Sequence, residues 1–369
     1  MRRPVEVFIQ FDWSLLLAAT TLSVMGLLAI YSIGISRETA DLFQFQKQIV
    51  ACLVGWALVF VAAFLDVRQL RSYAMPLYGV GALLLLGVLL FGTTIRGTRG
   101  WFVLGHLSFQ PVEIAKVFLA IFLAYYMSRH AHHRIGWIPF AGSAFATALY
   151  VGLVLLQPDF GSAVVMMVMW FTTAIFAGLP RRAWLILFAT VAVAGTALWT
   201  IGLKPYQRAR LESFINPAAD PLGAGYNVTQ ARIAIGSGGL FGKGLGEGSQ
   251  SRLRFLPEAS TDFVFSVLGE ELGLVGIAIT LGLFALLFHR MIRISAAAMD
   301  PFPQLLLIAL LSTLAFHVLV NAGMNLGIMP VTGIPLPFVS AAPSSILAAF
   351  LAIAVTQSIA VQRQPAAFR

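Results

Sequence analysis

Residues 13–35 read WSLLLAATTLSVMGLLAIYSIGI, a run without a single charged side chain. About 20 consecutive apolar residues are enough for a helix to cross the hydrocarbon core of a bilayer. The run is long for a signal peptide, and no small-residue cleavage site follows it. It therefore predicts a retained first transmembrane helix.

Windows of the same kind recur along the whole chain. Of the 369 residues, 59% are hydrophobic and 11% are charged, which is too much apolar surface for a soluble core to bury. The single cysteine, Cys52, lies in an apolar stretch and predicts packing, since no disulfide can form within the chain. The sequence predicts an all-α polytopic membrane protein, one domain over residues 1–369, with ten transmembrane helices. These windows are 13–35, 47–65, 73–92, 109–127, 137–156, 160–179, 183–202, 263–288, 304–328 and 337–361.

The arginines between the windows predict the orientation. Ten spans place both termini on one side, and short cytoplasmic segments carry an excess of Lys and Arg. With both termini in the cytoplasm, every short internal segment holds two arginines: Arg2 and Arg3, Arg68 and Arg71, Arg129 and Arg134, Arg181 and Arg182, Arg290 and Arg293, Arg363 and Arg369. Because the net charge of +9 is distributed in this way, without a basic tail or basic soluble domain, it argues against a nucleic-acid partner.

The segment 203–262, between the seventh and eighth windows, is the polar exception. Loops longer than about 12–15 residues are usually functional or disordered. This one combines aromatics, glycines and both signs of charge, so we expect a folded external cap. Within it, the apolar spacing of 226–235 predicts a short helix.

Asp262 is the last polar residue before the window 263–288. One interpretation is a cap on that helix. The other is a carboxylate at the level of a lipid headgroup, placed to act as general base on a sugar hydroxyl. Glu258, one turn upstream, can tune that acid or share a cation with it.

The same loop offers three cationic side chains. Arg208 and Arg210 can bind lipid headgroups non-specifically, or hold a substrate phosphate through their guanidinium forks. Lys243 stands among seven glycines between residues 236 and 248. That run predicts either a flexible hinge or a backbone surface that lets a polar headgroup approach closely.

Ionisable residues inside the apolar windows are candidates by default, because charges at membrane depth are costly. Glu113 and Lys116 are three residues apart on one helical face and can neutralise each other. Alternatively, they line an outward-facing polar cavity in which Lys116 can meet a phosphate. Gln110 opens the same helix, with Pro111 suited to its first turn.

Three more acids lie at or within the windows. Asp159 precedes an apolar window, where it can cap a helix or contribute to the site. Glu270 and Glu271 are adjacent, so they point about 100° apart on a helix. We expect a structural role for at least one of them.

Six segments, in chain order, resemble the SEDS family of cell-wall polymerases, and its RodA branch in particular. They are QPVEIAK (110–116), QPDFGS (157–162), DPLGAGY (220–226), AIGSGGLFGKG (234–244), FLPE with TDF (255–258 and 261–263) and GIPLP (333–337). The resemblance extends over nearly the whole chain.

The resemblance implies a peptidoglycan glycosyltransferase that polymerises lipid II outside the cytoplasmic membrane during elongation and supports rod shape. It implies a class B penicillin-binding protein and other elongation-complex membrane proteins as partners. The family's essential aspartate falls on Asp262. The implied reaction is direct transfer of the growing glycan from undecaprenyl pyrophosphate to the 4-hydroxyl of the incoming lipid II. A divalent cation, Mg or Mn, can bridge the pyrophosphate and the acids, although no dedicated metal site is evident.

The chain departs from the family pattern in three places. Gly100 follows Arg99 where a basic residue usually precedes tryptophan, and Val112 stands where serine is common. After Ser340, the family usually has an aromatic residue and two small residues, often glycines, whereas this chain has Ala341-Ala342-Pro343. We expect Pro343 to begin a helix there and to alter the local geometry.

Two other functions compete with the polymerase. A lipid II flippase needs a polar path to the cytoplasmic face, but the intramembrane charges gather in the predicted outer half. A scaffold that only activates a partner enzyme predicts that loss of the Asp262 carboxylate is harmless.

Overall fold

The computed structural model describes residues 10–35, 41–62, 64, 66–95, 97–105, 107–130, 136–178, 224–252 and 255–362. Its elements, in chain order, are α2 (Trp13–Ile35), α3 (Phe43–Ala62), α4 (Val67–Ser72), α5 (Ala74–Phe91), β1 (Thr93–Ile95), β2 (Thr98–Leu104), β3 (Leu107–Phe109), α6 (Pro111–Ser128), α7 (Trp137–Leu156), α8 (Phe160–Phe176), α11 (Ala224–Ser237), α12 (Ser249–Arg252), α13 (Val264–Ala296), α14 (Pro301–Leu326) and α15 (Pro343–Gln362).

Nine of the ten predicted membrane windows coincide with helices. Among the described residues, eight helices are long and apolar enough to cross a membrane, and α8 is a shorter apolar helix. The tenth window, 183–202, lies outside the described residues, so the count of ten spans stays a prediction. The short helix predicted over 226–235 is confirmed as α11.

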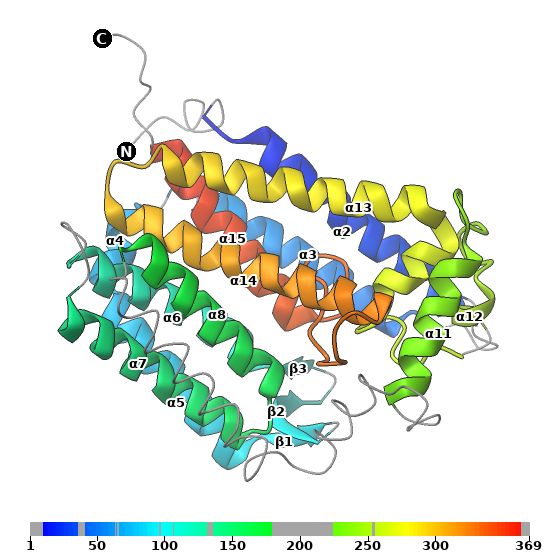
Figure 1. Ribbon diagram of the computed structural model, residues 1–369, viewed down its shortest axis with the longest axis horizontal. Helices are drawn as coiled ribbons and strands as arrows, with labels where there is room; N and C mark the ends of the chain where they lie inside the picture. The colour runs from blue at the N-terminus through cyan, green and yellow to red at the C-terminus, as the bar shows by residue number, and fades with distance from the viewer. Residues whose placement is uncertain are drawn as a thin grey trace.

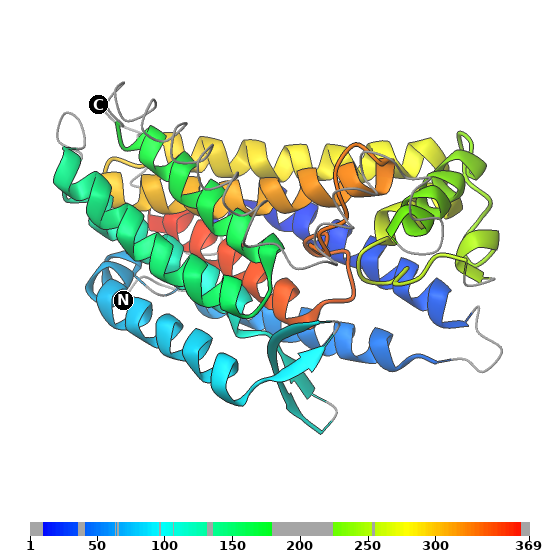
Figure 2. The same ribbon diagram turned by 60° about the horizontal axis from the view of Figure 1, so that its bottom comes forward.

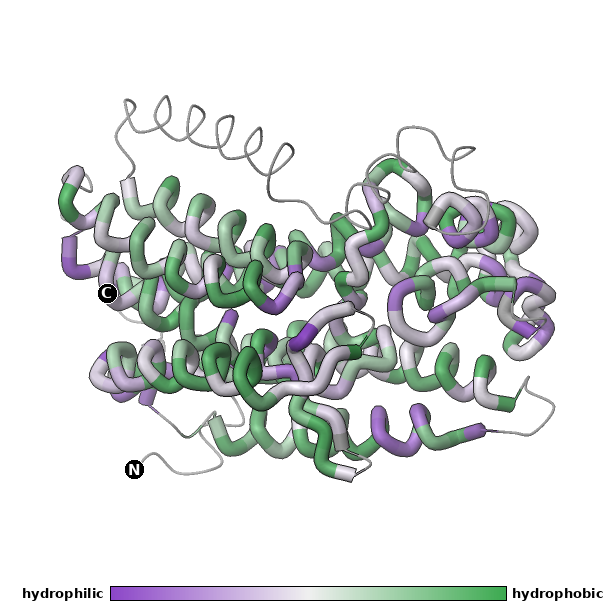
Figure 3. The backbone as a smooth tube through the Cα atoms, turned by 90° about the horizontal axis from the view of Figure 1, so that it is seen from below, coloured by the Kyte–Doolittle hydropathy of each residue, from purple (hydrophilic) through white to green (hydrophobic). Residues whose placement is uncertain are grey.

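The long helices lie side by side along the longest axis of the molecule (Figure 1). At the centre, α6 packs against α5 and α14, and α15 packs against α3 and α6. Most of α6 and α15 is buried, whereas only a minority of α5 and α3 is buried and both helices carry exposed apolar side chains, as expected where lipid replaces water. Hydrophobic colouring dominates these helices in Figure 3.

A three-stranded antiparallel sheet follows α5, between two of the predicted windows of a chain whose sequence predicted an all-α protein. The strand order is β1-β2-β3, with Thr94 paired to Arg99 and Phe102 to Phe109. β-Branched and aromatic residues favour strands, and pairing satisfies the backbone groups of the connection. The Arg99 side chain donates to the carbonyls of Gly92 (3.1 Å) and Leu90 (2.8 Å) and so caps the end of α5. The sheet lies toward the end of the bundle opposite the start of α2 (Figure 2).

Helix α13 is interrupted at Gly273, where the backbone has φ 68° and ψ −164°. In a continuous helix, the N–H groups of Leu274 and Val275 would donate to the carbonyls of Glu270 and Glu271. The interruption separates these two donors from their two acceptors. Such buried backbone groups need other partners.

The glycine-rich loop 238–246 supplies those partners from its own backbone. The four hydrogen bonds are Lys243 N to Glu270 O (3.0 Å), Gly244 N to Glu271 O (3.0 Å), Leu274 N to Gly239 O (2.9 Å) and Val275 N to Leu240 O (3.1 Å). A Cβ on Gly242 or on Gly273 would overlap backbone atoms of the opposite segment, and both residues have positive φ. Gly242 and Gly273 therefore allow the backbone of loop 238–246 to approach the backbone of α13 closely.

Candidate functional site

Asp262 lies in the turn that leads into α13. The turn closes on the carbonyl of Glu258, which accepts from the N–H groups of Thr261 (3.1 Å), Asp262 (3.1 Å) and Phe263 (3.3 Å). Glu258 itself has a left-handed φ of 55°. The N-cap position of α13 falls on Phe263. The Phe263 side chain makes no capping bond, and Asp262 sits half-buried at the junction before it.

Two asparagines of α14 hold the backbone of Asp262. Asn321 Nδ2 donates to the Asp262 carbonyl (3.1 Å) and to the Ile334 carbonyl (2.8 Å), and Asn325 Nδ2 donates to the Asp262 carbonyl (3.0 Å). Asn325 Oδ1 accepts from the Ser266 N–H (3.1 Å) and hydroxyl (2.6 Å). Neither residue was predicted from the sequence, although amides four positions apart in an apolar helix are a recognisable signal of interhelical hydrogen bonding.

The loop 331–342 packs on the same turn. The Ser340 hydroxyl donates to the Thr261 carbonyl (2.6 Å) and accepts from Leu336 N–H (2.8 Å). The Ala341 N–H donates to the Ser260 carbonyl (2.8 Å). Asp262 is thus held between α14 and the segment that precedes α15.

Gly333 places this loop beside the Asp262 carboxylate, since a Cβ built on it would lie 3.6 Å from Asp262 Oδ2. The departure Ala341-Ala342-Pro343 is accommodated without glycine, because the positive φ falls on Phe338 (64°) and Gly333 (73°) instead. Pro343 begins α15, as predicted.

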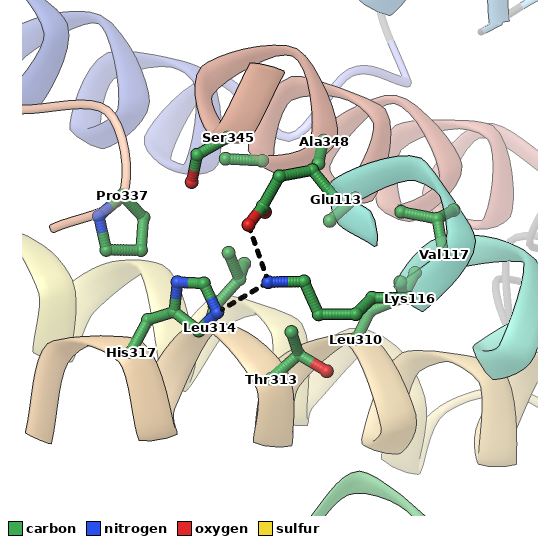
Figure 4. A pocket seen from close by; sticks show the side chains of 12 residues that line it. Glu113, Lys116, Val117, Leu310, Thr313, Leu314, His317, Pro337, Ser345 and Ala348 are labelled. Atoms are coloured by element: carbon green, nitrogen blue, oxygen red, sulfur yellow. Dashed lines mark hydrogen bonds and ion pairs between the residues drawn. The ribbon is translucent and has the colours of Figure 1, made fainter. Parts of the chain in front are cut away.

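Glu113 and Lys116 form the ion pair that their spacing predicted, and a histidine joins them. Lys116 Nζ lies 2.8 Å from Glu113 Oε1 and 3.1 Å from Nε2 of His317, a residue that was not predicted from the sequence (Figure 4). All three residues are at most 4% exposed. They line a cavity of about 20 Å³ between α6, α14 and α15. That volume holds about one water molecule and no sugar.

One face of α14 connects this cavity to Asp262. His317, Asn321 and Asn325 are spaced by four residues, so each lies about 6 Å along the helix from the next on one side. We call these three residues the polar stripe of α14. One end of the polar stripe contacts Lys116 and the other holds the Asp262 carbonyl.

Two predicted site residues begin helices. The Gln110 N–H donates to the Ser344 hydroxyl (2.9 Å), which ties the start of α6 to the start of α15. Asp159 caps α8 by accepting from the Ser162 N–H (3.0 Å) and hydroxyl (2.8 Å). Capping, the structural alternative for Asp159, is therefore confirmed.

Lys243 and the paired glutamates join the glycine-rich loop to α13. Lys243 Nζ lies 2.9 Å from Glu270 Oε1, which also accepts from the Ser249 hydroxyl (3.2 Å). Glu271 accepts from the Ser32 hydroxyl of α2. Both glutamates are buried, Glu270 in an ion pair and Glu271 in a hydrogen bond to another helix, which agrees with the structural role expected for at least one of them.

The remaining predicted residues divide into two groups. Arg208 and Arg210 lie outside the described residues, whereas Glu258 is exposed in the turn before Asp262. In the part of the chain that the structure describes, no group of three or more His, Cys, Asp or Glu could hold a metal ion. The divalent cation therefore stays a prediction without a donor set.

Comparison with known proteins fits this geometry. Residues 12–365 match the family model of the cell cycle proteins FtsW, RodA and SpoVE. The chain belongs to the FtsW/RodA/SpoVE family. The resemblance inferred from the six motifs is thus confirmed, and it covers nearly the whole chain.

Several relatives in the FtsW/RodA/SpoVE family match end to end. The peptidoglycan glycosyltransferase MrdB of Escherichia coli K12 is 36% identical, over 96% of this chain and 95% of its own. The probable peptidoglycan glycosyltransferase FtsW of Coxiella burnetii is 36% identical, over 99% and 100%. RodA of Treponema pallidum is 33% identical, over 95% and 97%.

Solved structures of the family agree with the fold. A chain from a study of polymerization and crosslinking by a peptidoglycan synthase complex superposes with a TM-score of 0.82 at 35% identity, covering 96% of this chain and 99% of that one. The rod shape determining protein RodA of Thermus thermophilus gives a TM-score of 0.71 at 33% identity, with 96% and 97% covered. Together with the apolar helices, these matches show that the chain is a multi-pass membrane protein similar to RodA.

Proposed function

We propose that this chain is a peptidoglycan glycosyltransferase that polymerises lipid II at the outer face of the bacterial cytoplasmic membrane. The observation that carries the proposal is the polar stripe of α14, which brings the buried Lys116 and the anchored Asp262 to one side of one helix. The Asp262 carboxylate lies just before α13, and the Lys116 cation lies at the other end of the polar stripe. A base and a cation so placed suit the transfer of a sugar from a pyrophosphate. The activity named for its full-length relatives supports the same conclusion.

In the proposed reaction, Asp262 takes the proton of a sugar 4-hydroxyl on the incoming lipid II. The freed oxygen attacks the anomeric carbon of the growing glycan. The bond from that carbon to undecaprenyl pyrophosphate breaks, and the pyrophosphate leaves with the electron pair. A placed general base typically contributes about 10²–10⁴-fold to such a step.

The negative charge that develops on the leaving pyrophosphate needs positive groups nearby. Lys116, held by Glu113 and His317, is the buried candidate for this role. Lys243, Arg208 and Arg210 are proposed to bind pyrophosphate from the loop, with Lys243 paired to Glu270 at rest. Glu258, Gln110 and Asp159 are proposed to shape the same binding region. No step is assigned to a metal ion.

The topology proposed here places both termini in the cytoplasm and residues 203–262 outside. A class B penicillin-binding protein is the proposed partner, with other elongation-complex membrane proteins around the pair. The match to a chain from a peptidoglycan synthase complex that coordinates polymerization with crosslinking supports this pairing.

The test is polymerisation of purified lipid II by the full-length chain, copurified with a partner transpeptidase whose crosslinking serine is replaced. Wild type, Asp262→Asn and Asp41→Asn are compared. Asp41 is exposed and accepts from the Phe43 N–H (3.0 Å), a bond that asparagine can keep, so it controls for the same chemical change elsewhere. We expect polymer from wild type and Asp41→Asn, and a rate lower by about 10²–10⁴-fold for Asp262→Asn.

The competing functions give different results in this assay. Equal polymer from wild type and Asp262→Asn would remove Asp262 as the base and favour a scaffold. No polymer from wild type, with lipid II crossing vesicle membranes in the presence of the chain, would favour the flippase.

A further inference from the structure

The backbone carbonyl of Asp262 accepts two amide N–H groups, from Asn321 (3.1 Å) and Asn325 (3.0 Å). Both asparagines have no exposed surface. A buried polar side chain in an apolar helix is unfavourable unless it is hydrogen-bonded, so an apolar residue would serve packing better. The presence of two amides at this point calls for a role that packing does not explain.

Asn325 Nδ2 also donates to the Asn321 carbonyl (2.8 Å), and further hydrogen bonds of the two amides go to the segments on either side of Asp262. Asn321 also donates to the Ile334 carbonyl, in the loop that reaches the Asp262 carboxylate through Gly333. Asn325 Oδ1 accepts from both donors of Ser266, in the first turn of α13. The two asparagines thus join the turn at Asp262, the first turn of α13 and the loop at Ile334 to α14.

We infer that Asn321 and Asn325 are positioning residues that hold Asp262 in its reactive orientation. This inference rests on the proposed function. The two amides grip the main chain, so the anchor engages neither carboxylate oxygen. A general base must lie within hydrogen-bond reach of the proton it removes, and a displacement of about 1 Å can reduce a rate by about 100-fold.

The opposite end of the bundle contains a matched contact. Gln357 of α15 is also fully buried, and its Nε2 donates to the carbonyl of Asp12 (2.9 Å), immediately before α2. Its Oε1 accepts from the Asp12 N–H (3.1 Å). Gln357→Glu removes one amide donor to an aspartate carbonyl, the same chemical change as Asn325→Asp, but far from Asp262.

The experiment measures lipid II polymerisation rates against lipid II concentration for wild type, Asn321→Asp, Asn325→Asp and Gln357→Glu, each with its partner transpeptidase. Rates are expressed per folded molecule, with the folded fraction taken from thermal unfolding. Asn325→Ser, which is neutral and too short to reach the Asp262 carbonyl, serves if the charged variants do not fold. Wild type and Asp262→Asn are run in parallel.

We expect the asparagine variants to lower kcat by about 10- to 100-fold, with KM for lipid II changed less than about threefold. Gln357→Glu should keep kcat within about twofold while lowering the melting temperature. Asparagine variants with the wild-type kcat would overturn the inference, and so would an equal loss of kcat in Gln357→Glu. If wild type polymerises and Asp262→Asn does not, such a result rejects the anchor alone; if wild type is inactive, the proposed function fails first.

Discussion

Asp12 and Asp262 stand at opposite ends of the bundle, and each precedes a long helix with its backbone carbonyl held by a buried amide. The Asp12 carboxylate is bound by Arg290, with Nε 3.0 and 2.9 Å from its two oxygens and Nη2 2.6 Å from Oδ2. It also accepts from the Leu15 N–H. The Asp262 carboxylate instead lies half-buried beside the small Gly333.

The difference separates two uses of a carboxylate. At Asp12, the side chain itself joins α2 to α13, while the backbone bonds Gln357 of α15, so the acid is a structural component. At Asp262, the two buried amides bond the main chain, and the side chain lies beside the loop that contains Gly333. An acid fixed through its backbone can change its protonation without breaking its anchor, as a general base must.

The largest effect should come from breaking the buried pair that the polar stripe of α14 contacts. In Lys116→Met, the Glu113 carboxylate stays buried without its cation, which costs about 3–5 kcal/mol. The double variant Glu113→Gln/Lys116→Met removes both charges and should recover most of that stability. Thermal unfolding in detergent measures the recovery, and lipid II polymerisation measures the function.

We expect no recovery of polymerisation in the double variant, because the substrate's pyrophosphate would still lack its buried cation. A double variant that polymerises at the wild-type rate would make the pair structural, as Asp12 and Arg290 are.

The second effect concerns the interruption of α13, which lies in the half of the helix nearest Asp262. Gly242→Ala combines a strained φ of 80° with overlap against the Glu271 carbonyl, at a cost of about 2–4 kcal/mol. Gly282→Ala is the matched control. Gly282 lies in the uninterrupted half of α13, where an added Cβ would meet nothing within 4 Å. A melting temperature for Gly242→Ala as high as that for Gly282→Ala would contradict the docking of loop 238–246.

Hydropathy found the transmembrane helices because a span must be long and apolar whatever its neighbours are. The interruption of α13 was not predictable in the same way. Gly273, Gly276 and Gly282 stand in one apolar run, and only the loop packed against Gly273 distinguishes it. The sheet after α5 was missed because its strands are short and lie between two apolar windows.

The site shows the same division. Asp262 was identified from its place at the boundary between polar and apolar sequence, and the family resemblance pointed to the same residue. His317, Asn321 and Asn325 were not predicted, because only side chains with a formal charge were taken as candidates at membrane depth. Two of them are uncharged amides, and their spacing of four residues was the signal available.

The third prediction tests the end of the bundle that contains Asp12. Arg290→Gln removes charge-assisted bonds to Asp12, which should cost about 1.5–3 kcal/mol of unfolding free energy. Polymerisation per folded molecule should remain within about twofold of wild type, because the contact is structural. The measurement pairs thermal unfolding with the polymerisation assay at matched folded protein. A loss of kcat comparable to that of Asp262→Asn would break the distinction between the two ends.

The smallest expected effect concerns Asp159. Its variants test whether this residue is needed for its charge or for capping α8. Asp159→Ala removes the acceptor for the Ser162 N–H and should cost about 1 kcal/mol, the usual value of an N-cap. Asp159→Asn keeps a capping oxygen without the charge and should restore most of that stability. If Asp159 resembles Asp12, both variants polymerise at nearly the wild-type rate per folded molecule. A stable Asp159→Asn with strongly reduced polymerisation would instead place its charge beside Asp262 in the chemistry.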